Sequence, residues 1–171
     1  MGKLGWFNRT LHNYRRVDFT VEKQYYNHID RLQHSINFHR SREEDGEDTY
    51  EEIDIESIAG LFIVNGIEQA LSRGFNPFAK VFYQYFQAQS FVKISSYKRI
   101  NAFLHASEIK VLDDLTAMIN EYFDDEYREH NQQLFEIERN DLIRFFIRNG
   151  CEHFNRVPIS KASNLLESRL V

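Results

Sequence analysis

Apolar side chains recur every three or four positions along most of this chain, the spacing that places them on one face of an α-helix. Asp18 or Thr20 stands where one such helix would begin and offers a capping oxygen. The helix is predicted to run to about residue 41. Its apolar stripe is formed by Val21, Tyr25, Ile29, Leu32 and Ile36.

The same spacing predicts that most of the remaining chain is helical. Gly74 is placed to end one helix and Gly150 to end the longest one. Pro77 suits the first position of a helix, and Ser95 or Ser96 is placed to start a short one. The predicted helices cover residues 55–73, 76–94, 95–103, 107–149 and 160–170.

Two stretches allow more than one interpretation. Residues 60–66 also resemble a short buried strand, but helix is favoured because no convincing second strand exists to pair with it; only residues 91–97 look β-like elsewhere. Residues 108–149 contain no Gly or Pro, so they form either one helix of about 60 Å or two helices. No internal repeat is evident. The fold class is therefore all-α, a single-domain bundle of six or seven helices.

A basic amphipathic arm is predicted to precede this helical domain. Apolar side chains stand at helical spacing in the arm, and basic side chains lie between and after them. The apolar set is Leu4, Phe7, Leu11 and Tyr14, and the basic set is Lys3, Arg9, Arg15 and Arg16. The predicted domains are therefore the arm, residues 1–17, and the helical domain, residues 18–171.

Charge is distributed in alternating blocks, although the net charge of −5 is ordinary. Residues 43–57 hold nine acidic and no basic side chains, whereas residues 1–42 hold eight basic and three acidic ones. The acidic block predicts an exposed loop near residues 42–54. This alternation argues against one uniform nucleic-acid surface and favours complementary packing within the fold or against a partner. The high aromatic share, 15%, suits a thin helical bundle held together by a few large side chains, and an excess can also indicate aromatic surface reserved for a partner.

The cysteine content and the lack of a recognisable targeting segment indicate a cytoplasmic protein. Cys151 is the only cysteine, so one chain holds no disulfide. No secretory signal is recognisable, and no apolar run approaches the roughly 20 residues of a transmembrane segment.

The best catalytic candidate is the hexapeptide from Arg148 to His153. An Arg with a polar residue after it and a His five positions on resembles the active-site motif of HEPN-type ribonucleases. That family is also a small helical bundle, and the resemblance implies metal-independent RNA cleavage, with His153 near the ribose 2′-hydroxyl and Arg148 near the phosphate. The residue types suit this chemistry, because His moves protons near neutral pH and Arg stabilises an anionic phosphorane. The structural alternative pairs Arg148 with nearby carboxylates and leaves His153 on a surface turn.

The remaining motifs do not indicate a metal or a cofactor. The seven histidines lack the Glu-x-x-His pairs of di-iron bundles. Gly46 fits the sixth position of a calcium loop, but Ser41 would then be a poor first ligand. Glu152 raises rather than lowers the thiol pKa of its neighbour Cys151. No cofactor, metal ligand or cysteine nucleophile is therefore predicted.

The sequence favours a non-enzymatic helical module for protein–protein interaction, such as an accessory subunit, adaptor or regulator in a larger assembly or homo-oligomer. A HEPN-like ribonuclease using Arg148 and His153 is one alternative, and a nucleic-acid binder acting through residues 3–16 is another. Two surfaces, one on the arm and one on the acidic loop, carry the leading hypothesis. Their residues are Trp6, Phe7, Arg9, Arg15 and Arg16, and Glu43, Glu44, Asp45, Glu47, Asp48, Glu51 and Glu52.

Overall fold

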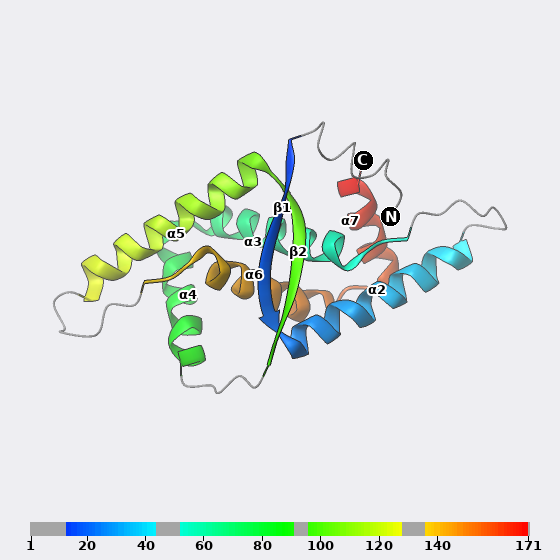
Figure 1. The fold of residues 1–171 in the computed structure, drawn as a ribbon, viewed down its shortest axis with the longest axis horizontal. Helices are drawn as coiled ribbons and strands as arrows, with labels where there is room; N and C mark the ends of the chain where they lie inside the picture. Colours follow the sequence, from blue (N-terminus) through cyan, green and yellow to red (C-terminus); the bar gives the residue numbers. More distant parts are fainter. Residues whose placement is uncertain (1–12, 44–51, 91–95, 128–135, 171) are drawn as a thin grey trace.

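A computed structural model of the protein describes residues 13–43, 52–90, 96–127 and 136–170. Within these ranges the chain forms six helices and one antiparallel pair of strands, the β1–β2 ribbon (Figure 1). The prediction of a mainly helical chain is thus confirmed. The elements in order are β1 (Tyr14–Glu22), α2 (Lys23–Glu43), α3 (Ile55–Arg73), α4 (Phe75–Ser90), β2 (Tyr97–His105), α5 (Ala106–Tyr127), α6 (Arg139–Phe154) and α7 (Ile159–Leu170).

The ribbon is the part of the fold that the helical prediction missed. Both strands alternate buried apolar and outward-facing residues, the period of a strand with one covered face. The buried set is Val17, Phe19 and Val21 in β1 and Ile100, Ala102 and Leu104 in β2. Each strand is the pairing partner of the other. Two predictions are wrong: no helix begins at Asp18 or Thr20, and residues 97–103 are strand rather than short helix.

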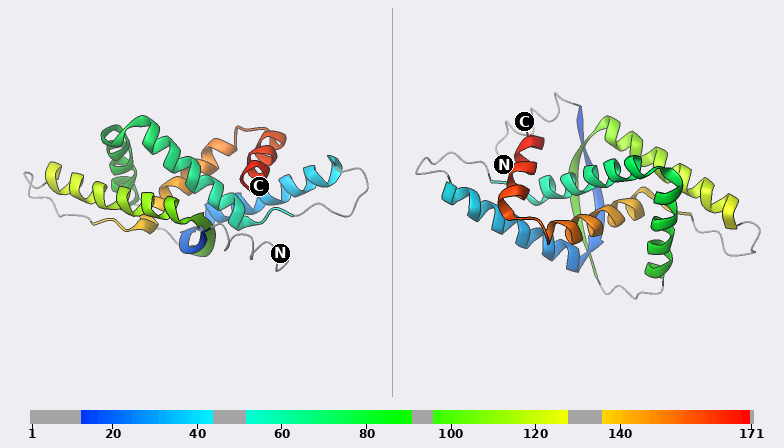
Figure 2. Two further views of the ribbon diagram at one scale, coloured as in Figure 1. Left: turned by 90° about the horizontal axis from the view of Figure 1, so that it is seen from above. Right: turned by 180° about the vertical axis from the view of Figure 1, so that it is seen from behind.

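Helix α6 covers the edge of β1 that faces away from β2. The Asn140 side-chain oxygen accepts a hydrogen bond from the Thr20 N–H at 2.9 Å, and Arg144 Nε donates to the Thr20 carbonyl at 3.0 Å. These bonds satisfy backbone groups that an unpaired strand edge would expose. Figure 2 shows the helices behind and beside the ribbon, so the described helices leave its outer face open.

The described elements form two structural repeats related by an approximate two-fold axis through the ribbon. One repeat is β1–α2–α3–α4 and the other is β2–α5–α6–α7. Each strand residue has its equivalent 83 positions later, and the central pair of the register joins Asp18 to its own equivalent, Asn101. In Figure 1 the axis points toward the viewer: α2 and α5 extend to opposite ends of the molecule, and α4 and α7 lie across the centre from one another.

The repeat is also present in the sequence, where none was predicted. Tyr14-Arg-Arg opens β1 and Tyr97-Lys-Arg opens β2. The pattern Phe-Ile-x-Asn-Gly-x-Glu occupies residues 62–68 in α3 and 146–152 in α6. Elsewhere the two halves share few residues at equivalent positions. A repeat confined to such short stretches is difficult to recognise before the fold aligns it.

Helices α3 and α6 cross at the centre of the core through a reciprocal pair of glycines and phenylalanines. A Cβ added to Gly66 would stand 2.2 Å from Cδ1 of Phe146, and one added to Gly150 would stand 2.3 Å from Cγ of Phe62. Each ring therefore fills the space that a side chain would need on the other helix. Because Gly150 serves this crossing inside α6, the prediction that it ends the helix is wrong; α6 continues to Phe154.

In each repeat an asparagine side chain binds the backbone of the segment that leads into the second helix. Asn37 donates from Nδ2 to the carbonyl of Ile53 at 3.0 Å and accepts from the Ile53 N–H at 2.9 Å. Asn120 makes the same two bonds to Ile137, at 3.0 and 2.8 Å. Both isoleucines are buried, so each asparagine satisfies backbone groups out of reach of water. The open question about residues 108–149 is thereby resolved in favour of two helices, α5 and α6.

Several other boundaries agree with the sequence. Residues 60–66 lie within α3, so the helical interpretation of that stretch is confirmed. Helix α3 ends before Gly74, whose φ of 85° favours glycine. The helices predicted near residues 76 and 160 are present, but they begin at Phe75 and Ile159, so Pro77 is the third residue of α4 rather than the first. None of the helices in the described ranges is long and apolar enough to cross a membrane.

Candidate interaction surface

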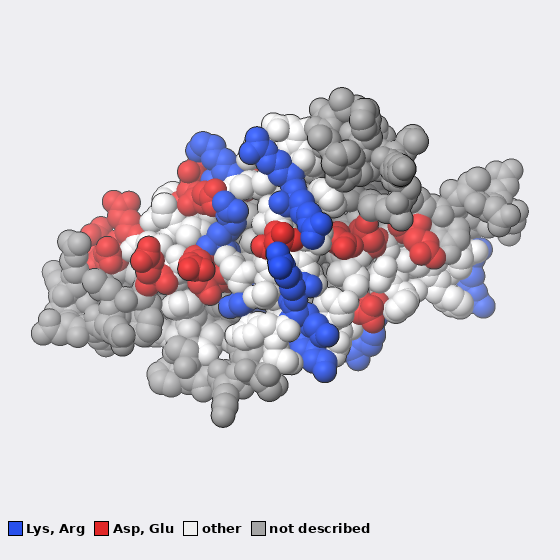
Figure 3. All heavy atoms as spheres, in the orientation of Figure 1, with Lys and Arg blue, Asp and Glu red and all other residues white. Residues whose placement is uncertain are grey.

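The outer face of the ribbon is an exposed surface made by alternate residues of both strands. Since successive side chains of a strand point to opposite sides, burying one set presents the other set to solvent. Figure 3 looks onto this face and shows basic side chains along the ribbon, with acidic side chains to either side of it. The outer-face residues are Tyr14, Arg16, Asp18 and Thr20 in β1 and Tyr97, Arg99, Asn101 and Phe103 in β2.

Two arginines dominate the charge of the outer face. Arg16 Nε lies 3.1 Å from Oδ1 of Asp18, and Arg99 Nη2 lies 3.4 Å from Oδ2 of the same carboxylate. One carboxylate thus holds two guanidinium groups, and their side chains stay 60% and 75% exposed. The neighbouring Arg15 and Lys98 are also exposed, so four basic side chains against Asp18 and the buried Glu22 leave the ribbon with a net charge of +2.

These groups occur at equivalent positions on both sides of the two-fold axis. Arg16 and Arg99 are equivalent positions in the two strands, as are Tyr14 and Tyr97. The ribbon therefore presents the same tyrosine–arginine pattern twice, in opposite directions. The centre breaks the symmetry, since a carboxylate in β1 faces a carboxamide in β2.

Aromatic groups flank the arginines. Tyr97 is 43% exposed, and the Arg144 guanidinium lies 4.4 Å from the centre of its ring. At the other end, the rings of Tyr14 and His105 meet edge to face with centroids 5.5 Å apart. These contacts hold flat, partly exposed rings at both ends of the outer face, where a ligand can contact them.

The structure places the predicted binding residues in different situations. Arg15 and Arg16, predicted as part of an amphipathic arm, belong to β1, and only Arg16 is on the outer face. Glu43 is the last residue of α2, and Glu52 is exposed two residues before the N-cap of α3. The others lie outside the described residues: Trp6, Phe7, Arg9, Glu44, Asp45, Glu47, Asp48 and Glu51.

Lys98, Arg99 and Asn101 were not predicted as binding residues, because their spacing was interpreted as a short helix. A usable signal was present, because Tyr97-Lys-Arg repeats the Tyr14-Arg-Arg of the arm. Alternation of apolar and polar residues follows both triplets and indicates paired strands.

The two residues of the catalytic candidate are not brought together. Arg148 Nε donates to Glu152 Oε1 at 3.0 Å, and its guanidinium lies 5.2 Å from the centre of the Tyr85 ring. Burial lowers the pKa of Arg148, but the hydrogen bond and charge of Glu152 outweigh burial and raise it. His153 follows five positions later on the same helix, which places it roughly 140° around the axis. It lines a pocket whose walls do not include Arg148.

Cys151, which lies between these two residues in the sequence, is buried. It is 2% exposed, and burial, with a smaller effect of the nearby Glu152 carboxylate, raises the pKa of its thiol to about 12. At neutral pH this sulfur is therefore a protonated, apolar group of the core. In the described part of the chain, no three His, Cys, Asp or Glu side chains gather as metal ligands would.

Comparison of the chain with protein-family models, with curated proteins and with solved structures gives no match.

Proposed function

We propose that this protein is a non-enzymatic binding module that places the outer face of its β1–β2 ribbon in the major groove of double-helical DNA. The observation that carries the proposal is the pair of exposed, two-fold-related arginines, Arg16 and Arg99, on an open two-stranded ribbon. The major groove of B-DNA is about 12 Å wide and accommodates a two-stranded β-ribbon. The nucleic-acid alternative predicted for residues 3–16 is thereby moved from the arm to the ribbon.

The outer-face residues are of the types that read base edges. Arginine bonds two acceptors of guanine, asparagine pairs with adenine, and a carboxylate accepts from the amino group of cytosine. Arg16, Arg99, Asn101 and Asp18 supply all three. Arg15 and Lys98, at the margins, are suited to the phosphates that fix the register.

The symmetry of the ribbon predicts the symmetry of its target. A two-fold-related pair of readers suits two half-sites in inverted orientation. Here each half-site would contain a guanine contacted by one arginine. The centre should depart from a perfect palindrome, because Asp18 and Asn101 prefer different bases.

Acidic side chains on α5 either have partners where the helix leaves the ribbon or lie in its last two turns. Glu108 accepts a hydrogen bond from the His105 N–H at 2.8 Å. Asp113 is bound by Arg139 at 2.6 Å and Asp114 by Lys110 at 2.6 Å, so both are neutralised. Asp124 follows the first residue of α5 by 18 positions, which is about 27 Å of helix. At that distance from the ribbon, salt screens most of its repulsion of phosphate.

The test starts by selecting duplexes from a pool with a random central segment and measuring affinity for the selected sequence by fluorescence anisotropy at several salt concentrations. The double variant Arg16→Ala, Arg99→Ala should weaken binding by at least about tenfold, since each arginine–guanine pair contributes about 1–3 kcal/mol. Lys161→Ala, a change of charge on α7, is the control and should leave affinity nearly unchanged.

Two results would overturn the proposal. One is a selection that enriches no sequence and yields no salt-dependent duplex binding. The other is a double variant that binds the selected duplex as tightly as the control does.

A protein partner remains the second candidate, favoured by the composition of the same face. Exposed tyrosine beside arginine is the residue pair enriched at the energetic centres of protein interfaces, and Tyr97 with Arg144 has this arrangement. A photo-crosslinking residue at position 97 should then capture one defined protein in cells, and Arg16→Ala with Arg99→Ala should abolish that capture. The same residue at position 161 is the control. Crosslinks that are identical at both positions would reject this candidate.

A further inference from the structure

Asp18 lies at the centre of the outer face, where its carboxylate binds both of the arginines that are proposed to read DNA. Arg16 Nε donates to Oδ1 of Asp18 at 3.1 Å, and Arg99 Nη2 donates to Oδ2 at 3.4 Å. Arg16 belongs to the same strand as Asp18, whereas Arg99 lies diagonally across the ribbon on the other strand. Each oxygen of the carboxylate therefore holds one of the two guanidinium groups.

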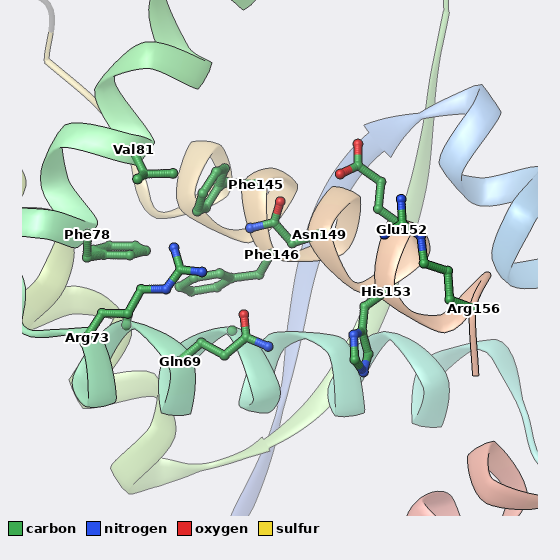
Figure 4. A pocket seen from close by; sticks show the side chains of 12 residues that line it. Gln69, Arg73, Phe78, Val81, Phe145, Phe146, Asn149, Glu152, His153 and Arg156 are labelled. Atoms are coloured by element: carbon green, nitrogen blue, oxygen red, sulfur yellow. The ribbon is translucent and has the colours of Figure 1, made fainter. Parts of the chain in front are cut away.

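This arrangement differs from the other ion pairs between described residues, in which each carboxylate binds a single basic side chain. Glu152 is an example. Its carboxylate projects away from the His153 ring (Figure 4) and forms its ion pair with Arg148, 3.0 Å away. A carboxylate shared by two arginines of opposite strands is thus a particular feature of the outer face.

The fold does not require a negative charge at this position. The Asp18 side chain is 41% exposed, and Asn101 occupies the equivalent position on the other strand. Asparagine has nearly the shape of aspartate but carries no charge. Exposed ion pairs also contribute little to stability. Packing therefore accounts for the size of the Asp18 side chain and not for its charge.

The carboxylate holds both guanidinium groups near the centre of the ribbon. In the register, Arg16 lies two residues to one side of the central pair, and Arg99 lies two residues to the other side. At about 3.4 Å per residue, the two positions are about 14 Å apart along the ribbon. Guanidinium groups extended straight outward would reach bases roughly four base pairs apart. Reading two guanines at that separation requires both arginines to leave Asp18.

The release of the arginines has different consequences on different DNA. On a matching site, guanine offers two acceptors to each arginine, and a central cytosine donates its amino group to the freed carboxylate. Every group that lost a partner then has a new one. On an unrelated sequence, the arginines have only phosphate oxygens, and the carboxylate faces the negative potential of the groove without a donor. The carboxylate therefore opposes binding to unrelated DNA more strongly.

We propose that Asp18 determines specificity: by holding Arg16 and Arg99, its carboxylate suppresses binding to unrelated duplexes more than binding to the matching one. This inference rests on the proposed reading of DNA by the ribbon and assigns a further residue to it. Removal of the charge should yield a protein that binds unrelated DNA more tightly and discriminates less between sequences.

The test compares Asp18→Asn with the original protein on the selected duplex and on a duplex of scrambled sequence, by fluorescence anisotropy. Affinity for the scrambled duplex should rise about tenfold, because one repelling charge is removed and two arginines are freed for phosphates. Affinity for the selected duplex should change by less than about threefold, because the contact to cytosine is lost as the repulsion is relieved. The ratio of the two affinities should therefore fall.

The salt dependence of binding to the scrambled duplex gives a second measurement. The slope of log affinity against log salt concentration should steepen by about one to two in Asp18→Asn, as the freed arginines contact phosphates. Asp114→Asn removes the same charge from α5, where Lys110 binds it at 2.6 Å, and is the matched control. Circular dichroism spectra of both variants should match that of the original protein, since both side chains are exposed.

The outcomes separate this inference from the proposed function. An affinity ratio that Asp18→Asn leaves unchanged, or that Asp114→Asn lowers equally, would overturn the role of Asp18. The reading of DNA by the ribbon would still stand if Arg16→Ala with Arg99→Ala weakened binding to the selected duplex. If the original protein bound neither duplex, the proposed function and this inference would both fail.

Discussion

The α3–α6 crossing and the β1–β2 ribbon both lie on the approximate two-fold axis, yet they use repeated residues for opposite purposes. At the crossing, Gly66 and Gly150 are repeated because each must admit a phenylalanine from the other helix. On the ribbon, Arg16 and Arg99 are repeated although both project into solvent and no packing requires them. Repetition inside the core thus follows from the fold, whereas repetition on the surface points to a symmetrical partner.

The largest effect is expected from filling the crossing. Gly66→Ala should lower the free energy of unfolding by about 3 kcal/mol, the upper end for an overpacked core, because the new methyl group meets the buried Phe146 ring. This loss would occur despite a gain of about 1 kcal/mol in helix propensity. Urea denaturation measures it, and Ser72→Ala, an exposed change on the same helix, should have almost no effect.

A double-mutant cycle identifies the cause of that loss. Combining Gly66→Ala with Phe146→Leu should cost less than the sum of the single changes, because the smaller side chain makes room for the methyl group. Additive losses would mean that the glycine is needed for another reason. The repetition of the two glycines would then not be explained by the phenylalanines that face them.

A smaller, symmetrical effect is expected at the asparagines. Asn37→Ala and Asn120→Ala should each lower the free energy of unfolding by about 2 kcal/mol, because each leaves the N–H and carbonyl of a buried isoleucine without partners. Denaturation of the two variants side by side measures both values. Losses that differ severalfold would show that the repeats do not share this support equally.

The helices were predictable because their signal is local. Stripes such as Ile29, Leu32 and Ile36 repeat within one segment, and burying them needs no knowledge of distant residues. The strands were not predicted, since β1 forms only by pairing with β2, 83 residues away. The candidate surface was missed for the same reason. Arg15 and Arg16 were recognised as a basic cluster, but Arg99 joins them only across the ribbon.

The pH dependence of stability gives a third, smaller effect in the core. Burial raises the pKa of the Cys151 thiol from its ordinary value near 9 to about 12, so the unfolded chain loses this proton first. The stability that the buried, protonated thiol contributes is fully present below about pH 9. The free energy of unfolding should fall as pH rises from there toward 12. One thiol limits the slope to about 1.4 kcal/mol per pH unit. Denaturation between pH 8 and 10 measures it.

The matched variants separate the thiol from other groups. Cys151→Ala should flatten the slope in that range, whereas Lys161→Ala should retain it. The range stops at pH 10 because burial also raises the pKa values of Tyr25 and Tyr85, which add to the slope above it. An unchanged slope in Cys151→Ala would show that the thiol ionises as readily in the folded protein as in the unfolded one.

The smallest effect on stability is expected at the ribbon, where it separates a structural role of the repeated arginines from a binding role. Arg16→Ala with Arg99→Ala should change the free energy of unfolding by less than about 0.5 kcal/mol, because exposed ion pairs contribute little. The same double variant is expected to lose at least tenfold in affinity for a selected duplex. Denaturation and anisotropy on one preparation measure both quantities. If stability fell as far as in Gly66→Ala, the arginines would be structural, and their repetition would carry no information about a partner.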